Sequence, residues 1–428
     1  MISLRPPAER ALLVGAPRKR TNARHALDEH LKELAALADT AGAEVVGEVT
    51  QQIDKPHPAT YLGKGKMDEL RDRVRELDAS LVIFDDELTP AQGKNIEEHL
   101  TTRVVDRAEL ILDIFATRAR TSEAKMQVEL AQLEYTLPRL TRMWTHLEKF
   151  RGGIGVRGPG ETQLESDRRL IQVRIKLLKE RQADVQRARD VQRQSRRGEF
   201  RASLVGYTNV GKSSILRSLS GADDIFVENR LFATLDPLTR DVQLGDHGHV
   251  LLTDTVGFIR KLPHHLVASF RATLEEATDS DILLHVIDAS HPTWEEQRVV
   301  VDQVLAELGL QEKPVLHVFN KIDRVDDPTL AAMQERIANL LPNSVFVSSV
   351  AADGLEPLRR ALIVALRGRT NVAELRLGAG DGKLLAEIHR GSEVLDQRMD
   401  GEELVLRARV DEVLAGRLRR AGVRVTVA

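Results

Sequence analysis

The stretch Gly206–Ser213, GYTNVGKS, decides the fold class. It matches GxxxxGK[ST], in which glycines let backbone N–H groups wrap a phosphate at the start of a helix. An apolar run at Arg201–Val205 precedes it, so we expect a strand, a phosphate loop and a helix in succession. In this arrangement Lys212 contacts the β- and γ-phosphates, and the Ser213 hydroxyl is a Mg²⁺ ligand. The sequence therefore predicts a nucleotide-binding α/β domain.

A second apolar strand is predicted at His249–Gly257, HVLLTDTVG, downstream of the phosphate loop. Its end supplies Asp254, which is placed to hold Mg²⁺ through water, and Gly257, whose N–H can reach the γ-phosphate. Ligands bind beyond the carboxyl ends of the strands in open α/β sheets. The two motifs therefore predict one site for phosphate and Mg²⁺.

The identity of the nucleotide base is predicted from the segment that follows a third apolar strand, Pro314–Phe319. This strand leads into Asn320-Lys321-Ile322-Asp323, and the Asp323 carboxylate can accept both the N1–H and the 2-amino N–H of guanine. Adenine offers no such donor pair, so this arrangement selects GTP over ATP. Two roles stay open for Asn320, which can meet the base edge or tie the loop, while the Lys321 stem can cover the ring face.

Hydrolysis is assigned to a small set of groups. Leu231–Pro237 reads LFATLDP, and we expect Thr234 to place its hydroxyl on Mg²⁺, with Thr239 and Thr255 as rivals. Many GTPases orient the attacking water with a Gln directly after this glycine, where this chain has Phe258. Either hydrolysis is slow until a partner completes the site, or other groups position the water. The expected catalytic residues are Lys212, Thr234 and Gly257, and the expected Mg²⁺ ligands are Ser213, Thr234 and, through water, Asp254.

The remaining nucleotide contacts follow from the same segments. Val345–Val347 leads into Ser348-Ser349, whose backbone N–H can address guanine O6. Asn209 is a candidate ligand for a monovalent cation such as K⁺, with a purely structural loop amide as the alternative. The predicted nucleotide-binding residues are Gly206, Tyr207, Thr208, Asn209, Val210, Gly211, Lys212, Ser213, Ser214, Phe232, Ala233, Thr234, Leu235, Asp236, Asp254, Thr255, Val256, Gly257, Asn320, Lys321, Ile322, Asp323, Ser348, Ser349 and Val350.

Charge is distributed unevenly along the chain. The 428 residues hold 62 Lys and Arg against 65 Asp and Glu, but residues 116–198 hold 19 against 10. Apolar residues recur at helical spacing on both sides of Arg151–Gly160, RGGIGVRGPG, which no helix tolerates. We therefore predict a basic helical hairpin with a glycine-rich tip, kinked at Pro138. Such a block suits a polyanion, with a solvated charged helix as the alternative.

Composition and periodicity predict the rest of the architecture. Strands alternating with helices predict an N-terminal α/β domain over residues 1–118, followed by the hairpin over 119–198, the GTPase domain over 199–369 and a small α+β domain of βαββαβ order over 370–428. The chain has no apolar run of membrane-spanning length, no secretory signal pattern and no cysteine. These absences predict a cytoplasmic protein without disulfides, thiolate metal sites or a cysteine nucleophile.

With these motifs placed, the chain resembles the HflX family of translational GTPases over nearly its whole length. The similar segments are Tyr61–Leu70 (YLGKGKMDEL), Leu81–Gln92 (LVIFDDELTPAQ), Arg151–Glu165 (RGGIGVRGPGETQLE), Phe232–Pro237 (FATLDP) and Asp254–Phe258 (DTVGF). The resemblance implies binding of GTP and GDP with Mg²⁺, association with the large ribosomal subunit and its rRNA, and ribosome splitting and recycling under stress. It also implies a mostly monomeric protein and a hydrophobic residue in place of the catalytic Gln.

In this interpretation the hairpin enters ribosomal RNA, and the expected RNA contacts are Arg151, Gly152, Gly153, Arg157 and Gly158.

Ser348-Ser349 departs from the Ser-Ala usual in the family. Some members act on ATP through the N-terminal domain, but no adenine site is recognisable in this sequence. The alternative is a GTP-dependent signalling switch whose helical arm binds a protein, which predicts exposed apolar stripes on the arm and little sensitivity to salt.

Overall fold

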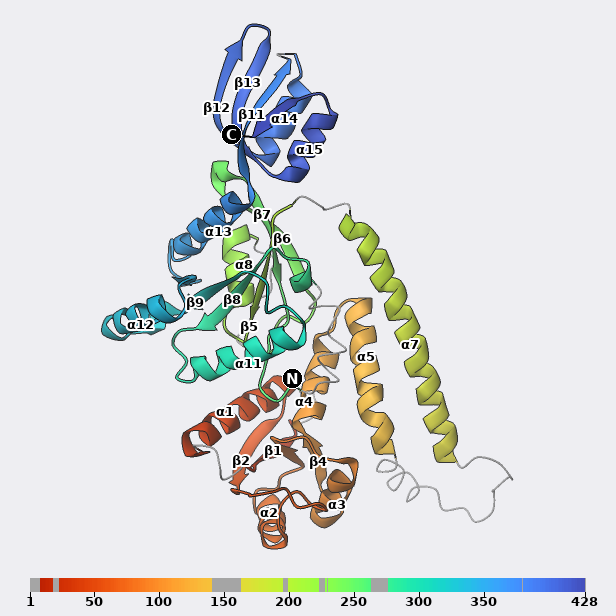
Figure 1. Ribbon diagram of the computed structural model, residues 1–428. Coiled ribbons are helices and arrows are strands. Elements are labelled where there is room, and N and C mark those ends of the chain that lie inside the picture. The colour runs from red at the N-terminus through yellow and green to blue at the C-terminus, as the bar shows by residue number, and fades with distance from the viewer. Residues whose placement is uncertain are drawn as a thin grey trace, which may run out of the picture. The chain divides into compact units, whose positions relative to one another are not determined.

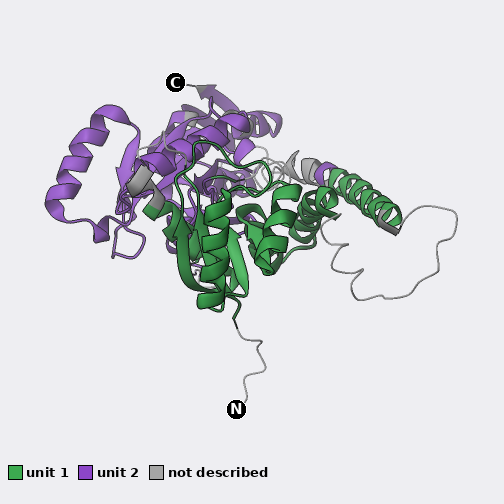
Figure 2. Ribbon diagram, turned by 90° about the horizontal axis from the view of Figure 1, so that it is seen from below, with its two compact units in different colours: residues 1–185, 230–232, 261–270 green, residues 186–229, 233–260, 271–428 purple. Residues whose placement is uncertain are grey.

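The computed structural model describes residues 8–17, 23–140, 163–194, 199–222, 228, 230–262, 276–378 and 380–427. The chain divides into two compact units, which are described separately (Figure 2). The first comprises residues 1–185 with 230–232 and 261–270, and the second comprises the remainder. No helix in the described part of the chain is long and apolar enough to cross a membrane.

The first unit contains a parallel sheet of order β2-β1-β3-β4 in its described residues. Helices follow the strands in alternation, with α1 packed beside α4 and α2 beside α3. This doubly wound arrangement confirms the predicted α/β alternation. The bounds are β1 (Arg10–Gly15), α1 (Ala23–Ala41), β2 (Glu44–Thr50), α2 (Lys64–Glu76), β3 (Leu81–Phe84), α3 (Pro90–Leu100), β4 (Arg103–Asp106) and α4 (Arg107–Arg118).

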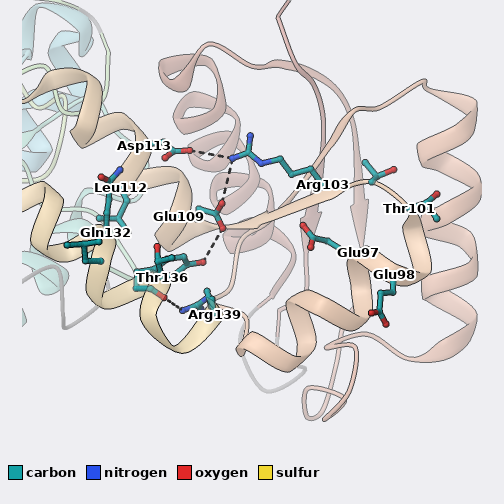
Figure 3. Close-up of a pocket in the computed structure, with 13 residues that line it drawn as sticks. Glu97, Glu98, Thr101, Arg103, Glu109, Leu112, Asp113, Gln132, Thr136 and Arg139 are labelled. Carbon is teal, nitrogen blue, oxygen red and sulfur yellow. Dashed lines mark hydrogen bonds and ion pairs between the residues drawn. The ribbon is translucent and has the colours of Figure 1, made fainter. Parts of the chain in front are cut away.

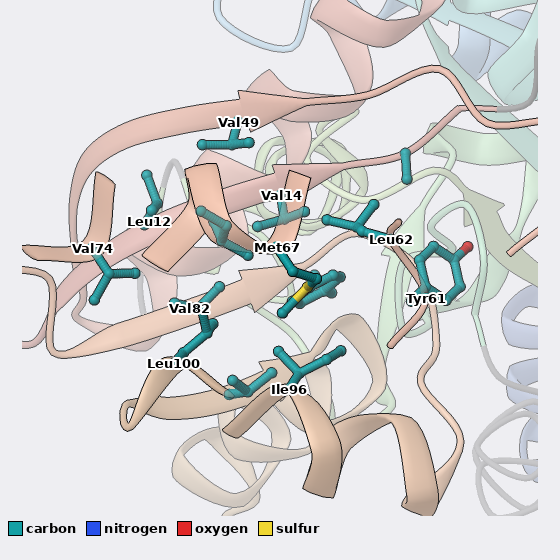
Figure 4. Close-up of a cluster of buried hydrophobic side chains, with 14 of the residues drawn as sticks. Leu12, Val14, Val49, Tyr61, Leu62, Met67, Val74, Val82, Ile96 and Leu100 are labelled. Atoms are coloured by element: carbon teal, nitrogen blue, oxygen red, sulfur yellow. The ribbon is translucent and has the colours of Figure 1, made fainter. Parts of the chain in front are cut away.

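A hydrophobic core joins this sheet to α2 and α3 (Figure 4). Leu12 and Val82 of the strands and Met67 and Ile96 of the helices are each at most 1% exposed. Burying one such side chain completely contributes about 1.5–3 kcal/mol relative to leaving it in water. The alternating strands and helices therefore form a unit with a hydrophobic core of its own.

The arm consists of α5 (Ser122–Thr136), the 3₁₀ turn η1 (Leu137–Arg139) and α7 (Gln163–Gln194). The two helices lie side by side (Figure 1), and Arg174 of α7 donates to Glu129 of α5 at 2.7 Å. Leu178 on the same face of α7 is fully buried. The α-helical pattern is interrupted at Pro138, as predicted, because proline has no N–H to donate and its ring crowds the preceding turn.

The second unit contains a six-stranded sheet of order β10-β9-β8-β5-β7-β6 in the part that the structure describes. All neighbours are parallel except β6 and β7. The bounds are β5 (Arg201–Gly206), α8 (Lys212–Ser220), β6 (Leu238–Gln243), η2 (Gly245–His247), β7 (His249–Asp254), β8 (Ile282–Asp288), α11 (Trp294–Glu307), β9 (Val315–Asn320), η3 (Ile322–Arg324), α12 (Asp327–Leu340), β10 (Ser344–Phe346) and α13 (Glu356–Arg369).

A smaller antiparallel sheet of order β12-β13-β11-β14 ends the chain. Its βαββαβ order is the predicted one, and its inner face carries a core of its own that includes Leu375, Ile388, Leu406 and Leu418. The bounds are β11 (Asn371–Gly378), α14 (Gly382–Gly391), β12 (Glu393–Asp400), β13 (Glu403–Val410), α15 (Glu412–Arg420) and β14 (Arg424–Val427). The predicted fold class, a phosphate-loop α/β domain with additional domains, is confirmed.

Candidate functional site

The phosphate loop connects β5 to α8 as the sequence predicts. Gly211 has φ +98°, and a Cβ there would lie 2.3 Å from Asn320 Nδ2, so this position requires glycine. Lys212 Nζ donates to the Tyr207 carbonyl at 2.9 Å and is buried. Burial lowers the pKa of Lys212 to about 8. The loop therefore folds around the Lys212 ammonium, which the sequence predicts to contact the β- and γ-phosphates.

Three side-chain oxygens meet at the carboxyl ends of β5 and β7. The Ser213 hydroxyl donates to Asp254 Oδ2 at 2.6 Å, and its oxygen lies 2.8 Å from Thr234 Oγ1. Asp254 is fully buried, and its other oxygen, Oδ1, has no hydrogen-bond partner among the described residues. Burial raises the pKa of Asp254, against the opposing charge of Lys212. An all-oxygen set with a free carboxylate oxygen fits Mg²⁺.

The structure distinguishes the three threonines that compete for this position. Thr239 pairs its hydroxyl with Thr253 at 2.8 Å across β6 and β7. Thr255 is fully buried and donates to the Leu204 carbonyl at 2.7 Å. Of these three, Thr234 alone brings its hydroxyl to Ser213.

The DTVGF segment is bound to the phosphate loop through backbone contacts. Phe258 donates its N–H to the Gly206 carbonyl at 3.0 Å and accepts the Thr208 N–H at 2.7 Å. A Cβ on Gly257 would lie 2.7 Å from Thr208 Cα, so the backbone approaches too closely for a side chain. The Phe258 ring is 1% exposed and has no hydrogen-bonding group. It packs in the core and cannot align water.

Three other residues predicted to contact the nucleotide differ in their packing. Phe232 is buried in the first unit, where its ring packs edge-on against Phe115 at a centroid distance of 4.7 Å. Leu235 is also buried, whereas Val350 is 78% exposed.

The guanine loop is held by a set of polar contacts. Asn320 is fully buried, donates to the Val210 carbonyl at 2.9 Å and accepts the Ser349 N–H at 3.1 Å. Of its two open roles, the structure shows loop tying. The Ser348 hydroxyl donates to Asp323 Oδ1 at 2.5 Å, so it fixes the orientation of that carboxylate. This hydroxyl contact was not predicted, because only a backbone N–H of Ser348-Ser349 was expected to act.

Lys321 lies between the guanine and phosphate loops. Its Nζ donates to the Asn209 carbonyl at 2.8 Å and to Asp288 Oδ2 at 2.7 Å. Asp288 was not among the predicted site residues. Its position at the carboxyl end of β8, where ligands bind in open α/β sheets, could have indicated it. No group of three or more His, Asp or Glu side chains in the described residues is arranged to hold a metal ion. The Mg²⁺ candidate is the mixed hydroxyl and carboxylate set of Ser213, Thr234 and Asp254.

A separate pocket of about 920 Å³ lies in the first unit, between β4, α4 and α5 (Figure 3). Several polar residues of its lining have partners. The Tyr135 hydroxyl donates to Asp106 at 2.9 Å, and Arg139 donates to the Leu88 carbonyl at 2.7 Å. Arg103 is shared by Glu109 and Asp113 at 3.6 and 3.8 Å. The Tyr135 and Arg139 contacts anchor the base of the arm on this unit. No residue predicted to bind the nucleotide lines the pocket.

The predicted RNA contacts lie outside the described residues. Arg151, Gly152, Gly153, Arg157 and Gly158 all fall in the segment 141–162, between the two arm helices. The described helix α7 carries an exposed apolar stripe at Leu170, Val173 and Leu177, which are 66%, 61% and 37% exposed. The structure thus leaves the RNA contacts as a prediction and adds an apolar feature to the arm.

Comparison with known proteins gives consistent matches along the chain. Residues 28–116 match the family described as GTP-binding GTPase N-terminal, residues 118–196 its middle region, and residues 201–321 the family described as 50S ribosome-binding GTPase. A solved GTP-binding protein of Sulfolobus solfataricus, in complex with GDP, is 26% identical with a TM-score of 0.44, covering 84% of this chain and 99% of that chain.

Curated relatives match at higher identity. GTPase HflX of Magnetococcus marinus is 43% identical over 99% of both chains, and that of Lacrimispora saccharolytica is 47% identical over 86% of both. GTPase HflX of Escherichia coli is 44% identical over 85% of both chains. These matches extend well beyond the nucleotide motifs, through the N-terminal and middle regions. The protein is a GTP-binding GTPase, and the chain belongs to the HflX family.

Proposed function

We propose that this GTPase acts on the large ribosomal subunit, binding its rRNA and splitting or recycling ribosomes under stress. The observation that carries the proposal is the match of its GTPase region to a family described as 50S ribosome-binding, together with the excess of basic residues in 116–198. A basic arm forms salt-dependent contacts with phosphates. We also propose a cytoplasmic, mostly monomeric protein, as the family resemblance implies, with the domain division predicted from the sequence.

The nucleotide site supports a mechanism in which GTP controls the affinity for the ribosome. Lys212 stabilises the β- and γ-phosphates, the Gly257 N–H contacts the γ-phosphate, and Asp323 accepts the two guanine donors. Ser348 and Asn320 fix the loop that carries Asp323, with contacts of 2.5 and 2.9 Å. Binding of a nucleotide to groups already oriented loses little conformational entropy.

Ser213 and Thr234, with Asp254 through water, are the groups that would hold Mg²⁺. Oδ1 of Asp254 has no hydrogen-bond partner in the part of the chain that the structure describes, and this supports the assignment, because a buried carboxylate oxygen without a donor is unfavourable. When bound, Mg²⁺ neutralises charge that develops on the phosphates. Asn209 remains a candidate ligand for K⁺.

Hydrolysis without a water-orienting side chain is expected to be slow in the isolated protein. Phe258 occupies the position where many GTPases carry Gln, and its ring is in the core. The ribosome then accelerates the reaction by fixing the segments of Thr234 and Asp254 around the γ-phosphate. Preorganised dipoles and charges of this kind are worth several kcal/mol.

Co-sedimentation with ribosomal subunits tests the proposal. We expect binding to the large subunit with a non-hydrolysable GTP analogue, weaker binding with GDP, and a steep loss of binding as salt increases. The same binding with and without nucleotide would contradict a GTP-controlled ribosome factor.

The second candidate is a signalling switch whose arm binds a protein, and one observation favours it. Leu170, Val173 and Leu177 form an exposed apolar stripe on α7. Contiguous exposed apolar surface marks protein contacts. Under this alternative, substituting the stripe by polar residues weakens association and added salt has little effect.

A further inference from the structure

Asp288, at the end of β8, has both carboxylate oxygens fixed by the protein. Oδ1 accepts the Ser290 N–H at 3.0 Å and the Ser290 hydroxyl at 2.6 Å. Oδ2 accepts Lys321 Nζ at 2.7 Å. Only 11% of the Asp288 side chain is exposed. Asp288 is therefore a rigid, mostly buried acceptor adjoining the guanine loop.

Lys321 connects this acceptor to the two loops that bind the nucleotide. Its ammonium also donates to the Asn209 carbonyl of the phosphate loop, and its side chain is 15% exposed. Its backbone has φ 64° and forms the N-terminal cap of η3, the turn that contains Asp323. The conformation of Lys321 is thus joined directly to the position of the guanine-reading carboxylate two residues later.

We propose that Asp288 is a positioning residue for guanine nucleotides, which acts by holding Lys321. With its ammonium fixed on Asp288, the four-carbon stem of Lys321 lies along the guanine site and the phosphate and guanine loops are joined. Asp288 does not touch the nucleotide. The inference rests on the guanine site proposed above and adds a residue that its motifs do not contain.

The physical reason lies in the cost of burying an unpaired charge. Without Asp288, the Lys321 ammonium keeps a neutral carbonyl as its hydrogen-bond partner, which compensates a buried charge poorly. The flexible lysine stem then turns toward water. The face of the base loses its cover, and bound nucleotide dissociates faster.

The experiment measures dissociation of GDP that carries a fluorescent N-methylanthraniloyl group, by stopped-flow displacement with unlabelled GDP. We expect Asp288→Ala to dissociate the nucleotide roughly tenfold faster, the effect of losing one charge-assisted hydrogen bond. Lys321→Met keeps the stem but removes the ammonium, and it should give a similar increase. The double variant should be no faster than Lys321→Met alone, because Asp288 acts through Lys321.

Asp281→Ala is the matched control. Asp281 directly precedes the other end of β8 and accepts the Arg201 N–H at 2.9 Å. Its removal perturbs β8 without touching Lys321, so GDP dissociation should stay at the wild-type rate. If Asp288→Ala fails to fold, Asp288→Asn serves instead, since it keeps an acceptor for Ser290 but loses the charge.

Wild-type dissociation in the Asp288 variant, or multiplied effects in the double variant, would overturn the inference. Failure of the underlying guanine site gives a different result. In that case Asp323→Asn would dissociate GDP at the wild-type rate, whatever the behaviour of Asp288→Ala.

Discussion

The Ser213 hydroxyl donates a 2.6 Å hydrogen bond to the fully buried Asp254. This contact joins the first turn of α8 to the end of β7, so the phosphate loop and the DTVG segment share one polar centre. Thr234 completes it at 2.8 Å from the same hydroxyl.

The first prediction concerns the threonine that serves hydrolysis. Thr234→Ala should lower single-turnover GTP hydrolysis roughly 100-fold, because it removes an oxygen aimed at the Mg²⁺ and γ-phosphate region. Thr239→Ala is the control, since that hydroxyl pairs with Thr253 instead. Lys212→Ala and Ser213→Ala should abolish turnover. Equal rates for the two threonine variants would disprove the assignment of Thr234.

The second prediction concerns the choice of base. Asp323→Asn should weaken GTP binding by roughly 2–4 kcal/mol, because it removes a charge-assisted paired contact. The same variant should gain affinity for xanthosine triphosphate, and this gain controls for misfolding. Titration calorimetry with both nucleotides and with ATP provides the measurement. Equal affinity of the wild-type protein for ATP and GTP would refute the guanine site.

The third prediction concerns the arm. Replacing Arg151 and Arg157 by alanine should weaken association with the large subunit and reduce its salt dependence, because two phosphate contacts are lost. GTP affinity should not change. Arg360→Ala, which removes an exposed arginine of α13, is the control. Unchanged subunit binding by the arm variant across a salt titration would favour the protein-binding alternative.

The fourth prediction concerns Phe258. Its ring is 1% exposed, so truncation to alanine would cost about 3–5 kcal/mol of stability. Phe258→Leu retains much of the packing and should leave ribosome-stimulated hydrolysis largely intact. Single-turnover assays with and without large subunits test this expectation. Fast hydrolysis by the protein alone, unchanged by subunits, would reveal a water-orienting group elsewhere.

The fifth prediction is a pH dependence of stability. His285 and His317 lie opposite each other on β8 and β9, beside Asp302 and Arg298. Burial lowers the pKa of both histidines, that of His317 from 6.5 to about 4. Between these values the unfolded chain binds more protons than the folded one, so the free energy of unfolding falls as pH decreases.

Urea unfolding from about pH 7.5 to about pH 4.5 measures this slope. His317→Gln should reduce it, whereas His389→Gln, on the exposed surface of α14, should not. The same slope in both variants would assign the pH dependence to other groups.

Much of the fold was predictable because its signals are local. Two apolar runs, one ending at Gly206 and one at Asp254, predict strands without knowledge of the tertiary structure. The interruption of the helix at Pro138 follows from the missing N–H of proline. The side-chain partners were not predictable in this way. Asp288 is 33 residues from Lys321 in sequence, and only the pairing of β8 with β9 brings them together. Likewise, the choice among three threonines depended on which hydroxyl the folded loops bring to Ser213.

The antiparallel pair β6 and β7 has a consequence for local opening of the protein. The Thr234 segment leads into β6, and β7 ends at Asp254, with Leu238 paired directly to Asp254. In the sheet as described, β6 is the outermost strand and pairs with β7, whereas β7 also pairs with β5 on its other side. β6 can therefore open while β7 stays in the sheet, and its amide protons should exchange with solvent faster than those of β7. A nucleotide that holds the Thr234 segment should slow this exchange in β6.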